Sequence, residues 1–271
     1  MLKYRIMKGK NLKEDNMFKN SHCERSAKRQ MAKGFTLAEV LITLGIIGVV
    51  AAMTMPALIE HHQKKVTVNS LKKMYTTLMQ AAQRYQADNG VTFEEFDTSL
   101  DNEVFMQTYF LPYLKTIKKC TTMEQCYGQK TPLAIDRKTP IAAELLYVLP
   151  DGSYIGLIKQ PGGRLFYFDI DGTKGSNLSG RDIFYFFLIN TSTMETYGAC
   201  GPIQATLKSG IYPGGYGSCY VPFTQYKRAD LLDNQLHRTC NHNAQRVGDS
   251  GDACAALIML DGWEIKDDYP W

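Results

Sequence analysis

The sequence predicts an α+β protein in which a long N-terminal helix packs on an antiparallel β-sheet, followed by a C-terminal region with disulfides. A run of twenty uncharged residues, Val40–Ile59, continues into a helical pattern of apolar residues. Four strand-like segments follow, and six of the seven cysteines lie after residue 119. Helical and strand patterns that are segregated along a chain are typical of the α+β class. The 271 residues are 44% hydrophobic with a mean hydropathy of −0.26, which excludes disordered, collagen-like and multi-span membrane proteins.

The net charge of +4 is divided unevenly along the chain. Residues 1–34 contain ten Lys and Arg against three acidic residues, whereas residues 35–271 contain 21 basic and 24 acidic side chains. The positive charge therefore belongs to a short N-terminal segment. The mildly acidic remainder offers no basic surface for nucleic acid, so that class of partner is not favoured.

The run Val40–Ile59 is long enough to cross a membrane. Its twenty residues would form a helix of about 30 Å, the thickness of the hydrocarbon layer. A buried helix of a soluble protein is the alternative, but this run is apolar on every side. Because Lys and Arg are concentrated before the run, the N-terminus is expected to stay in the cytoplasm and the remainder to be exported.

A cleaved secretory signal would also combine basic residues with an apolar stretch, and Val50-Ala51-Ala52 could be its cleavage site. Two features argue against that interpretation. Glu39 places a carboxylate at the very start of the apolar run, and the helical pattern continues past Ala52 without a break.

The residues that lead into the run are Lys33-Gly34-Phe35-Thr36-Leu37-Ala38-Glu39. With the apolar run behind them, they resemble the processing site of type IV pilins and type II secretion pseudopilins, over about residues 33–60. The resemblance implies a pilin-like fold. It also implies that prepilin peptidase cuts between Gly34 and Phe35, and that the new amine of Phe35 is then methylated.

Glu39 would become the fifth residue of the mature chain, at the membrane end of an apolar helix. A carboxylate in hydrocarbon is costly and needs a partner. In a filament of such subunits, the amine of a neighbour's Phe35 could supply it, and the pair would set the register of packing. The alternative is a glutamate that only reaches the membrane interface. Pro56 is expected to kink or loosen the helix.

After Glu60 the pattern becomes amphipathic, with one apolar stripe at helical spacing formed by Val68, Leu71, Tyr75, Leu78, Ala82 and Tyr85. Asp88-Asn89-Gly90 is a stop signal, so the helix should extend from Phe35 to near Asp88. The expected domains are a basic leader (1–34, cleaved), a transmembrane or filament-core helix (35–60), its amphipathic continuation (61–90) and an exported head (91–271). A start at Met31 would give a shorter leader.

The head should begin with a connecting region in which residues 100–118 are helical, limited by Pro112. Four strands are expected at 144–149, 153–158, 164–170 and 183–189. Pro150-Asp151-Gly152 indicates a hairpin turn between the first two strands. A short helix over 253–260 and a closing segment should end the chain.

The loop between the last two strands contains Asp169, Asp171, Asn177 and Asp182, and it resembles the same part of pseudopilin heads. Their oxygen atoms could bind Ca²⁺, because carboxylates that alternate along a loop suit this ion. The alternative is structural: Asp and Asn cap the turns while glycine supplies positive φ, and this is the interpretation we favour. No other cofactor is expected.

Without Cys23, which lies in the leader, six cysteines remain, and an even number is typical of an exported, disulfide-bonded domain. Six cysteines permit fifteen pairings. Proximity in sequence suggests three pairs: Cys120–Cys126, Cys200–Cys219 and Cys240–Cys254. His237, Cys240 and His242 resemble a metal site, but an oxidised Cys240 would have no thiolate to offer.

The resemblance implies a structural subunit, not an enzyme, anchored by one helix in the bacterial inner membrane. Its partners would be sibling pilins or pseudopilins, prepilin peptidase, an inner-membrane platform protein and an assembly ATPase. A type II secretion pseudopilus that supports protein export is the favoured assembly. The alternatives are a surface type IV pilin, for adhesion, twitching or DNA uptake, and a signal-anchored exported binding module or enzyme. The sequence contains no catalytic motif of the Gly-x-Ser-x-Gly, His-Glu-x-x-His or Walker type.

Overall fold

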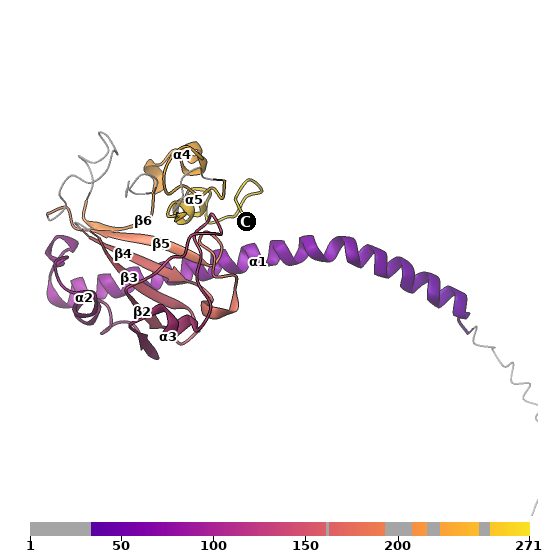
Figure 1. Ribbon diagram of the computed structural model, residues 1–271, viewed down its shortest axis with the longest axis horizontal. Helices are drawn as coiled ribbons and strands as arrows, with labels where there is room; N and C mark the ends of the chain where they lie inside the picture. Colours follow the sequence, from indigo (N-terminus) through magenta and orange to yellow (C-terminus); the bar gives the residue numbers. More distant parts are fainter. Residues whose placement is uncertain (1–33, 161–162, 193–207, 216–222, 244–249) are drawn as a thin grey trace, which may run out of the picture. The chain divides into compact units, whose positions relative to one another are not determined.

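The computed structural model describes residues 34–160, 163–192, 208–215, 223–243 and 250–271. The chain divides into two compact units, the first ending at Ala52 and the second comprising Met53–Trp271, which we call the globular unit. Helix α1, Leu37–Asn89, contributes to both units (Figure 1). Its bounds agree with the helix predicted from Phe35 to near Asp88.

The strands of the globular unit form one antiparallel sheet in the order β1-β2-β3-β4-β5-β6, so each strand pairs with its neighbour in sequence (Figure 1). The two longest pairings join β4 to β3 and to β5, with Tyr167 opposite Gly156 and Tyr185 respectively. The strands are β1 (Lys118–Cys120), β2 (Leu145–Val148), β3 (Tyr154–Gln160), β4 (Gly163–Asp169), β5 (Ile183–Ile189) and β6 (Gly210–Pro213).

Short helices connect or cover these strands. They are η1 (Phe93–Glu95), α2 (Asn102–Tyr109), α3 (Met123–Tyr127), η2 (Gly172–Lys174), η5 (Phe223–Gln225), α4 (Arg228–Leu232) and α5 (Cys254–Leu260). Helix α5 corresponds to the short C-terminal helix predicted from the sequence.

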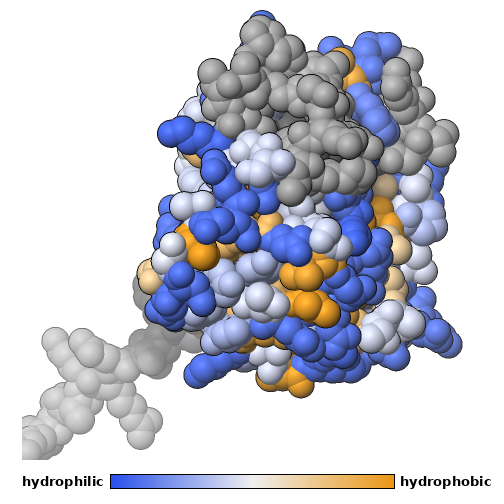
Figure 2. Space-filling view, turned by 90° about the vertical axis from the view of Figure 1, so that its left-hand side faces the viewer, coloured by the Kyte–Doolittle hydropathy of each residue, from blue (hydrophilic) through white to orange (hydrophobic). Residues whose placement is uncertain are grey.

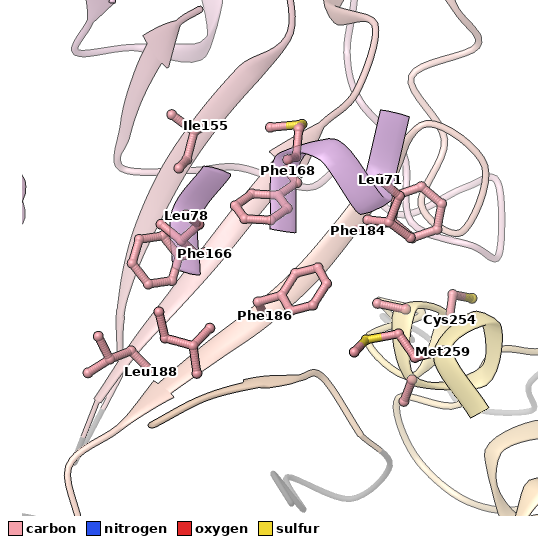
Figure 3. Packing of buried hydrophobic residues seen from close by; sticks show 14 of the residues in the cluster. Leu71, Leu78, Ile155, Phe166, Phe168, Phe184, Phe186, Leu188, Cys254 and Met259 are labelled. Atoms are coloured by element: carbon pink, nitrogen blue, oxygen red, sulfur yellow. The ribbon is translucent and has the colours of Figure 1, made fainter. Parts of the chain in front are cut away.

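The main core lies between one face of the sheet and the helices α1 and α5 (Figure 3). Leu71 and Leu78 of α1 are almost fully buried, because residues three or four apart share one side of a helix. They meet a layer of aromatic side chains that alternate along β4 and β5: Phe166, Phe168, Phe184 and Phe186. The stripe predicted along α1 is therefore the side that packs on the sheet.

The other face of the sheet is also buried. Tyr167, Tyr185 and Phe187 belong to a second apolar cluster, which includes Tyr127 of α3. Strands that are covered on both faces need apolar residues at every position, not at alternate ones. This explains why the segment Ile183–Ile189 is apolar throughout.

The turn between β2 and β3 contacts α1. Gly152 has φ = 88°, a conformation that favours glycine. Asp151 accepts hydrogen bonds from the backbone N–H of Ser153 (3.1 Å) and from its hydroxyl (2.5 Å), and it pairs with Lys73 Nζ at 2.6 Å. The hairpin signal in the sequence thus marks a turn that also lies beside the long helix.

The prediction of a helix over residues 100–118 is wrong in its length, because the observed helix is shorter. Helix α2 ends at Tyr109, and Phe110 leaves helical geometry with φ = −123°. The Phe110 ring packs into the core against Phe166, with 5.1 Å between centroids. Residues 118–120 are then free to pair with β2 as an additional strand.

Both edge strands of the sheet are short. Strand β1 has three residues and exposes Lys118 and Lys119, while β6 has four residues and ends in Pro213. Charged side chains and proline at an edge discourage pairing with another chain. Neither strand was predicted from the sequence, since neither has enough residues to show an alternating pattern.

Disulfides join Cys120 to Cys126 and Cys240 to Cys254. The first links β1 to α3, and the second fixes residue 240 to the first residue of α5. These are two of the three pairs suggested by proximity. The third, Cys200–Cys219, lies outside the described residues, as does Cys23.

Arg228 connects α4 to the C-terminal segment by hydrogen bonds to two carboxylates. Its guanidinium contacts Asp261 (2.7 and 2.9 Å) and Asp268 (2.6 Å twice), and Lys266 Nζ also lies 2.7 Å from Asp261. The Asp261 side chain is only 3% exposed. Burial alone would raise the pKa of Asp261, but the hydrogen bonds from Arg228 and Lys266 outweigh it and hold that pKa below its ordinary value.

Arg228→Ala is expected to destabilise the globular unit by about 2 kcal/mol near neutral pH, because charge-assisted hydrogen bonds to a buried carboxylate are lost. A lowered carboxyl pKa stabilises the fold above the unfolded value, near pH 4, and this contribution disappears as the pH falls through the folded value. Urea unfolding of the detergent-solubilised chain at several pH values would measure both effects. Lys138→Ala, at an exposed site, is the control, and a pH-independent difference would contradict the assignment.

Candidate functional site

The N-terminus of α1 is closed by a reciprocal capping arrangement between Thr36 and Glu39. Glu39 Oε2 accepts hydrogen bonds from the Thr36 backbone N–H and from Thr36 Oγ1, both at 2.8 Å. The Glu39 backbone N–H donates in turn to Thr36 Oγ1 at 3.2 Å. A threonine followed three residues later by glutamate is the sequence signature of this capping box. This cap was not among the features predicted from the sequence.

The two residues of the predicted cleavage bond precede this cap. Gly34 has no atom near the position of a side chain, and Phe35 is 86% exposed. Both residues lie before the first residue of α1, in non-helical backbone. The peptide bond between Gly34 and Phe35 is therefore sterically accessible to a protease.

The apolar residues of α1 that follow are exposed on all sides of the helix. Exposure of the large apolar side chains from Phe35 to Ile59 extends from 42% for Val40 to 86% for Phe35. Covering one such side chain contributes about 1.5–3 kcal/mol, so this surface requires lipid or protein around it. Among the described residues, α1 is the helix long and apolar enough to cross a membrane, with a mean hydropathy of 2.2 over its most apolar eighteen residues.

Three residues inside this segment bear on how helices can pack. Gly45 and Gly48 each leave open space where a side chain would stand, so another helix can approach closely there. Pro56 lies inside α1, and helical structure continues through it. Since proline has no N–H to donate, one carbonyl of the preceding turn lacks its usual helical hydrogen bond.

The acidic loop between β4 and β5 brings the predicted oxygen atoms close to one another. Asp169 is fully buried and accepts hydrogen bonds from Tyr127 Oη (2.5 Å) and from the backbone N–H of Gly172 (2.7 Å). Asp182 accepts hydrogen bonds from the Ser176 hydroxyl and from the backbone N–H of Leu178 (3.3 Å). The contacts with the backbone N–H groups of Gly172 and Leu178 cap turns within this loop.

Two side-chain oxygen atoms of the same loop lack the hydrogen bonds that their burial calls for. Among the residues that the structure describes, Asp171 Oδ1 and Asn177 Oδ1 are buried without a hydrogen-bond partner. Burial, together with the nearby negative charge of Asp182, raises the pKa of Asp171, and burial raises the pKa of Asp169 to about 8. Over the described residues, no group of three or more His, Cys, Asp or Glu is placed to hold a metal ion. Calcium binding stays a prediction.

Asp171→Asn tests the two interpretations of this loop against each other. A raised carboxyl pKa means that the folded state loses stability as the pH rises from the unfolded value, near 4, through the folded one. If these residues only cap turns, the variant should therefore have a higher melting temperature than the parent protein near neutral pH, with or without calcium. With a calcium site, added CaCl₂ should raise the melting temperature of the parent protein, and the variant should lose that gain.

The other metal hypothesis of the sequence does not hold. Cys240 is bonded to Cys254, so it has no thiolate to offer beside His237 and His242. In the same region Arg238 pairs with Asp252: its Nη1 lies 3.4 Å from Asp252 Oδ2.

A comparison with known protein families agrees with the processing motif at the N-terminus of α1. The prokaryotic N-terminal methylation motif matches residues 29–55, which include Gly34, Phe35 and Glu39. That motif, the exposed apolar helix and the α+β globular unit define the class of pilin-like proteins.

Within that class, the chain belongs to a family of unknown function (DUF6613), which matches residues 57–271. The family begins within the last residues of the apolar run and covers all of the sheet. No curated protein and no solved structure matches the chain.

Proposed function

We propose that the protein is a structural subunit of a type II secretion pseudopilus. Prepilin peptidase cuts between Gly34 and Phe35, and the amine of Phe35 is methylated. The mature subunit stays in the inner membrane through residues 35–60, with its head exported, until the platform protein and the assembly ATPase add it to the filament. The subunit performs no catalysis.

The observation that carries this proposal is the combination of the methylation motif with a helical segment, Val40–Ile59, whose large apolar side chains are exposed. A membrane covers that helix before assembly, and the same residues of sibling subunits cover it afterwards. Glu39 is the one carboxylate in the helix before Glu60, so it provides a single point of charge recognition in an otherwise apolar contact.

The choice of a pseudopilus over a surface pilus rests on two observations. The loop from Asp169 to Asp182 resembles the corresponding loop of pseudopilin heads. The body beyond residue 34 has an excess of acidic residues, which opposes the binding of DNA that some surface pili perform. The face of the globular unit shown in Figure 2 is mostly hydrophilic, with small separated apolar patches, as suits a unit that works in water.

Mass spectrometry of the membrane-extracted protein, without reduction, tests the processing step. We expect an N-terminal methylated Phe35 and a mass that corresponds to three disulfides. An N-terminus at Met53 would identify an ordinary secretory signal, and a retained leader would identify a simple signal-anchored protein. Either result would overturn the proposal.

Deletion of the gene distinguishes the two filament types. For a pseudopilus subunit, we expect exported proteins to accumulate inside the cell while surface filaments are unchanged. Loss of surface filaments with normal secretion would favour the type IV pilin instead.

A further inference from the structure

Helix α3 covers the face of the sheet that does not pack on α1. Its last residue, Tyr127, is buried in the second apolar cluster together with Tyr167. Met123 and Cys126 pack against the same cluster. Among the described residues, no side chain of the main core comes from α3. Release of the segment that contains α3, residues 121–128, would therefore leave the main core closed. We call this segment the α3 lid.

The Tyr127 hydroxyl connects the α3 lid to the acidic loop. It donates to Asp169 Oδ2 at 2.5 Å and lies 2.7 Å from the hydroxyl of Tyr167. Asp169 Oδ1 accepts hydrogen bonds from the backbone N–H groups of Asp171 (3.2 Å) and Gly172 (2.7 Å). Because Asp169 is fully buried, its carboxyl group depends on these donors in place of water. The position of the lid therefore affects the turn that Asp171 and Gly172 form.

The disulfide between Cys120 and Cys126 fastens the lid to the sheet. Helix α3 has five residues, and a helix this short is unstable alone. Tyr154 Oη donates to the Cys126 carbonyl at 3.2 Å, Met123 Sδ accepts a backbone N–H at 3.3 Å, and the exposed Lys118 donates to a carbonyl of α3. Closing the ring from residue 120 to residue 126 makes opening of the lid about fiftyfold rarer by chain entropy.

The two disulfides of the described residues differ in their exposure. Cys240 and Cys254 are fully buried in the main core, which shields them from an external thiolate. Cys126 is only half-buried, whereas its partner Cys120 is fully buried. A thiolate in solution can therefore attack Cys126, and Cys120 is then the leaving group.

We propose that the Cys120–Cys126 disulfide is a redox-sensitive latch on the α3 lid, which controls the access of water to the buried carboxyl group of Asp169. A dithiol opens the latch. One of its sulfur atoms forms a mixed disulfide with Cys126 while the Cys120 thiolate leaves, and its second sulfur atom then displaces Cys126. The dithiol becomes a cyclic disulfide, and both cysteines are reduced. A disulfide oxidant of the exported compartment reverses both steps. This inference rests on the proposed function only in that the head must be exported.

Hydrogen exchange of the full chain in nanodiscs tests the latch. The reporters are the backbone N–H of Gly128, which donates to the Glu124 carbonyl within the lid at 2.7 Å, and those of Asp171 and Gly172 in the acidic loop. We expect dithiothreitol to speed exchange about fiftyfold at Gly128 and about tenfold at the other two. The N–H groups of β5 should keep their slow exchange, because the main core stays closed.

Three variants separate the latch from a general loss of stability. Cys120→Ser with Cys126→Ser should reproduce the effect of dithiothreitol without a reductant. Tyr127→Phe keeps the disulfide but removes the donor to Asp169, so exchange should rise about tenfold in the acidic loop and stay slow at Gly128. Tyr113→Phe, which removes a hydroxyl that donates to Asp88 at the surface, should change neither region. If the double variant fails to fold, reduction of the folded parent chain still decides the question.

Three results would overturn the inference. The first is equal exchange at Gly128 in the oxidised and the reduced chain. The second is faster exchange at Gly128 without any change at Asp171 and Gly172, which would mean that the disulfide only braces its own loop. The third is an equal rise in β5, which would mean that reduction unfolds the whole globular unit. A methylated Phe35 would leave the proposed function standing in each case. A head found in the cytoplasm would overturn the proposed function without changing the exchange results.

Discussion

Replacing Glu39 with alanine is expected to abolish assembly while the protein still inserts in the membrane. In the filament, the carboxylate of Glu39 would face the amine of a neighbour's Phe35 in apolar surroundings. Removing one partner of such a buried pair costs about 3–5 kcal/mol, because the other charge is left uncompensated. The fraction of subunits in filaments should fall more than about a hundredfold. Insertion should persist, since alanine makes the helix more apolar.

Sedimentation of filaments and carbonate extraction of membranes measure the two properties separately. Glu124→Ala, which removes an exposed carboxylate of α3, is the matched control and should leave both unchanged. Normal filaments from the Glu39→Ala protein would exclude the register role and favour a glutamate that only caps its own helix.

The capping box refines the interpretation of this experiment. Glu39 already accepts two hydrogen bonds from Thr36 in the unassembled chain, so its carboxylate is partly satisfied before a neighbour arrives. Thr36→Val removes the hydroxyl but keeps the carboxylate and the backbone N–H. If the capping contacts alone explained the loss in Glu39→Ala, Thr36→Val should reproduce most of it. We expect a much smaller loss.

The second large effect is expected at Arg164, a fully buried charged residue of the globular unit. Its side chain is completely inaccessible to water. Nη1 donates to the carbonyl oxygens of Thr98 (2.6 Å) and Gly163 (3.0 Å), and Nη2 donates to that of Leu100. The guanidinium also lies 5.0 Å from the ring centroid of Phe105. Arg164 therefore ties the turn before α2 to the sheet.

Arg164→Leu is expected to destabilise the globular unit by about 3–5 kcal/mol, because three carbonyl groups lose charge-assisted hydrogen bonds and cannot all reach water. For a unit of this size, the melting temperature should fall by roughly 6–20 °C. Thermal unfolding followed by circular dichroism would measure the change. Arg84→Leu, at an exposed position of α1, should shift it by no more than about 2 °C. An equally small shift for Arg164→Leu would show that the turn is held by other contacts.

The long helix and the central strands could be predicted because their signals are local. The stripe along α1 and the unbroken apolar segment Ile183–Ile189 are visible in the sequence itself. The observed β5 has the bounds expected for the fourth strand, and β4 begins one residue early, at Gly163. The residues of the processing motif were also found directly, because their order along the chain carries the information.

The remaining features depend on partners that are distant in sequence. The burial of Arg164 depends on carbonyl groups 64 and 66 residues away, so the arginine alone gives no sign of it. Helix α2 ends at Tyr109, and the next side chain, Phe110, packs against Phe166, a residue 56 positions away. Strands β1 and β6 are defined by hydrogen bonds to their neighbours rather than by an alternating pattern. The capping box at Thr36 differs from these, since its signature was present in the sequence.

The strand order has a consequence for how the chain folds as it emerges from the ribosome or a membrane channel. Every strand of the sheet after the first pairs with the one before it, so the emerging chain never needs a later strand to complete an earlier pair. If the head is exported as proposed, translocation from the N-terminus would deliver α1 first and then each hairpin in turn, ready to dock on it. Such local pairing requires little loop closure and shortens the time during which unpaired edges are exposed. Helix α5, with Cys254, emerges last and closes a core that has already formed.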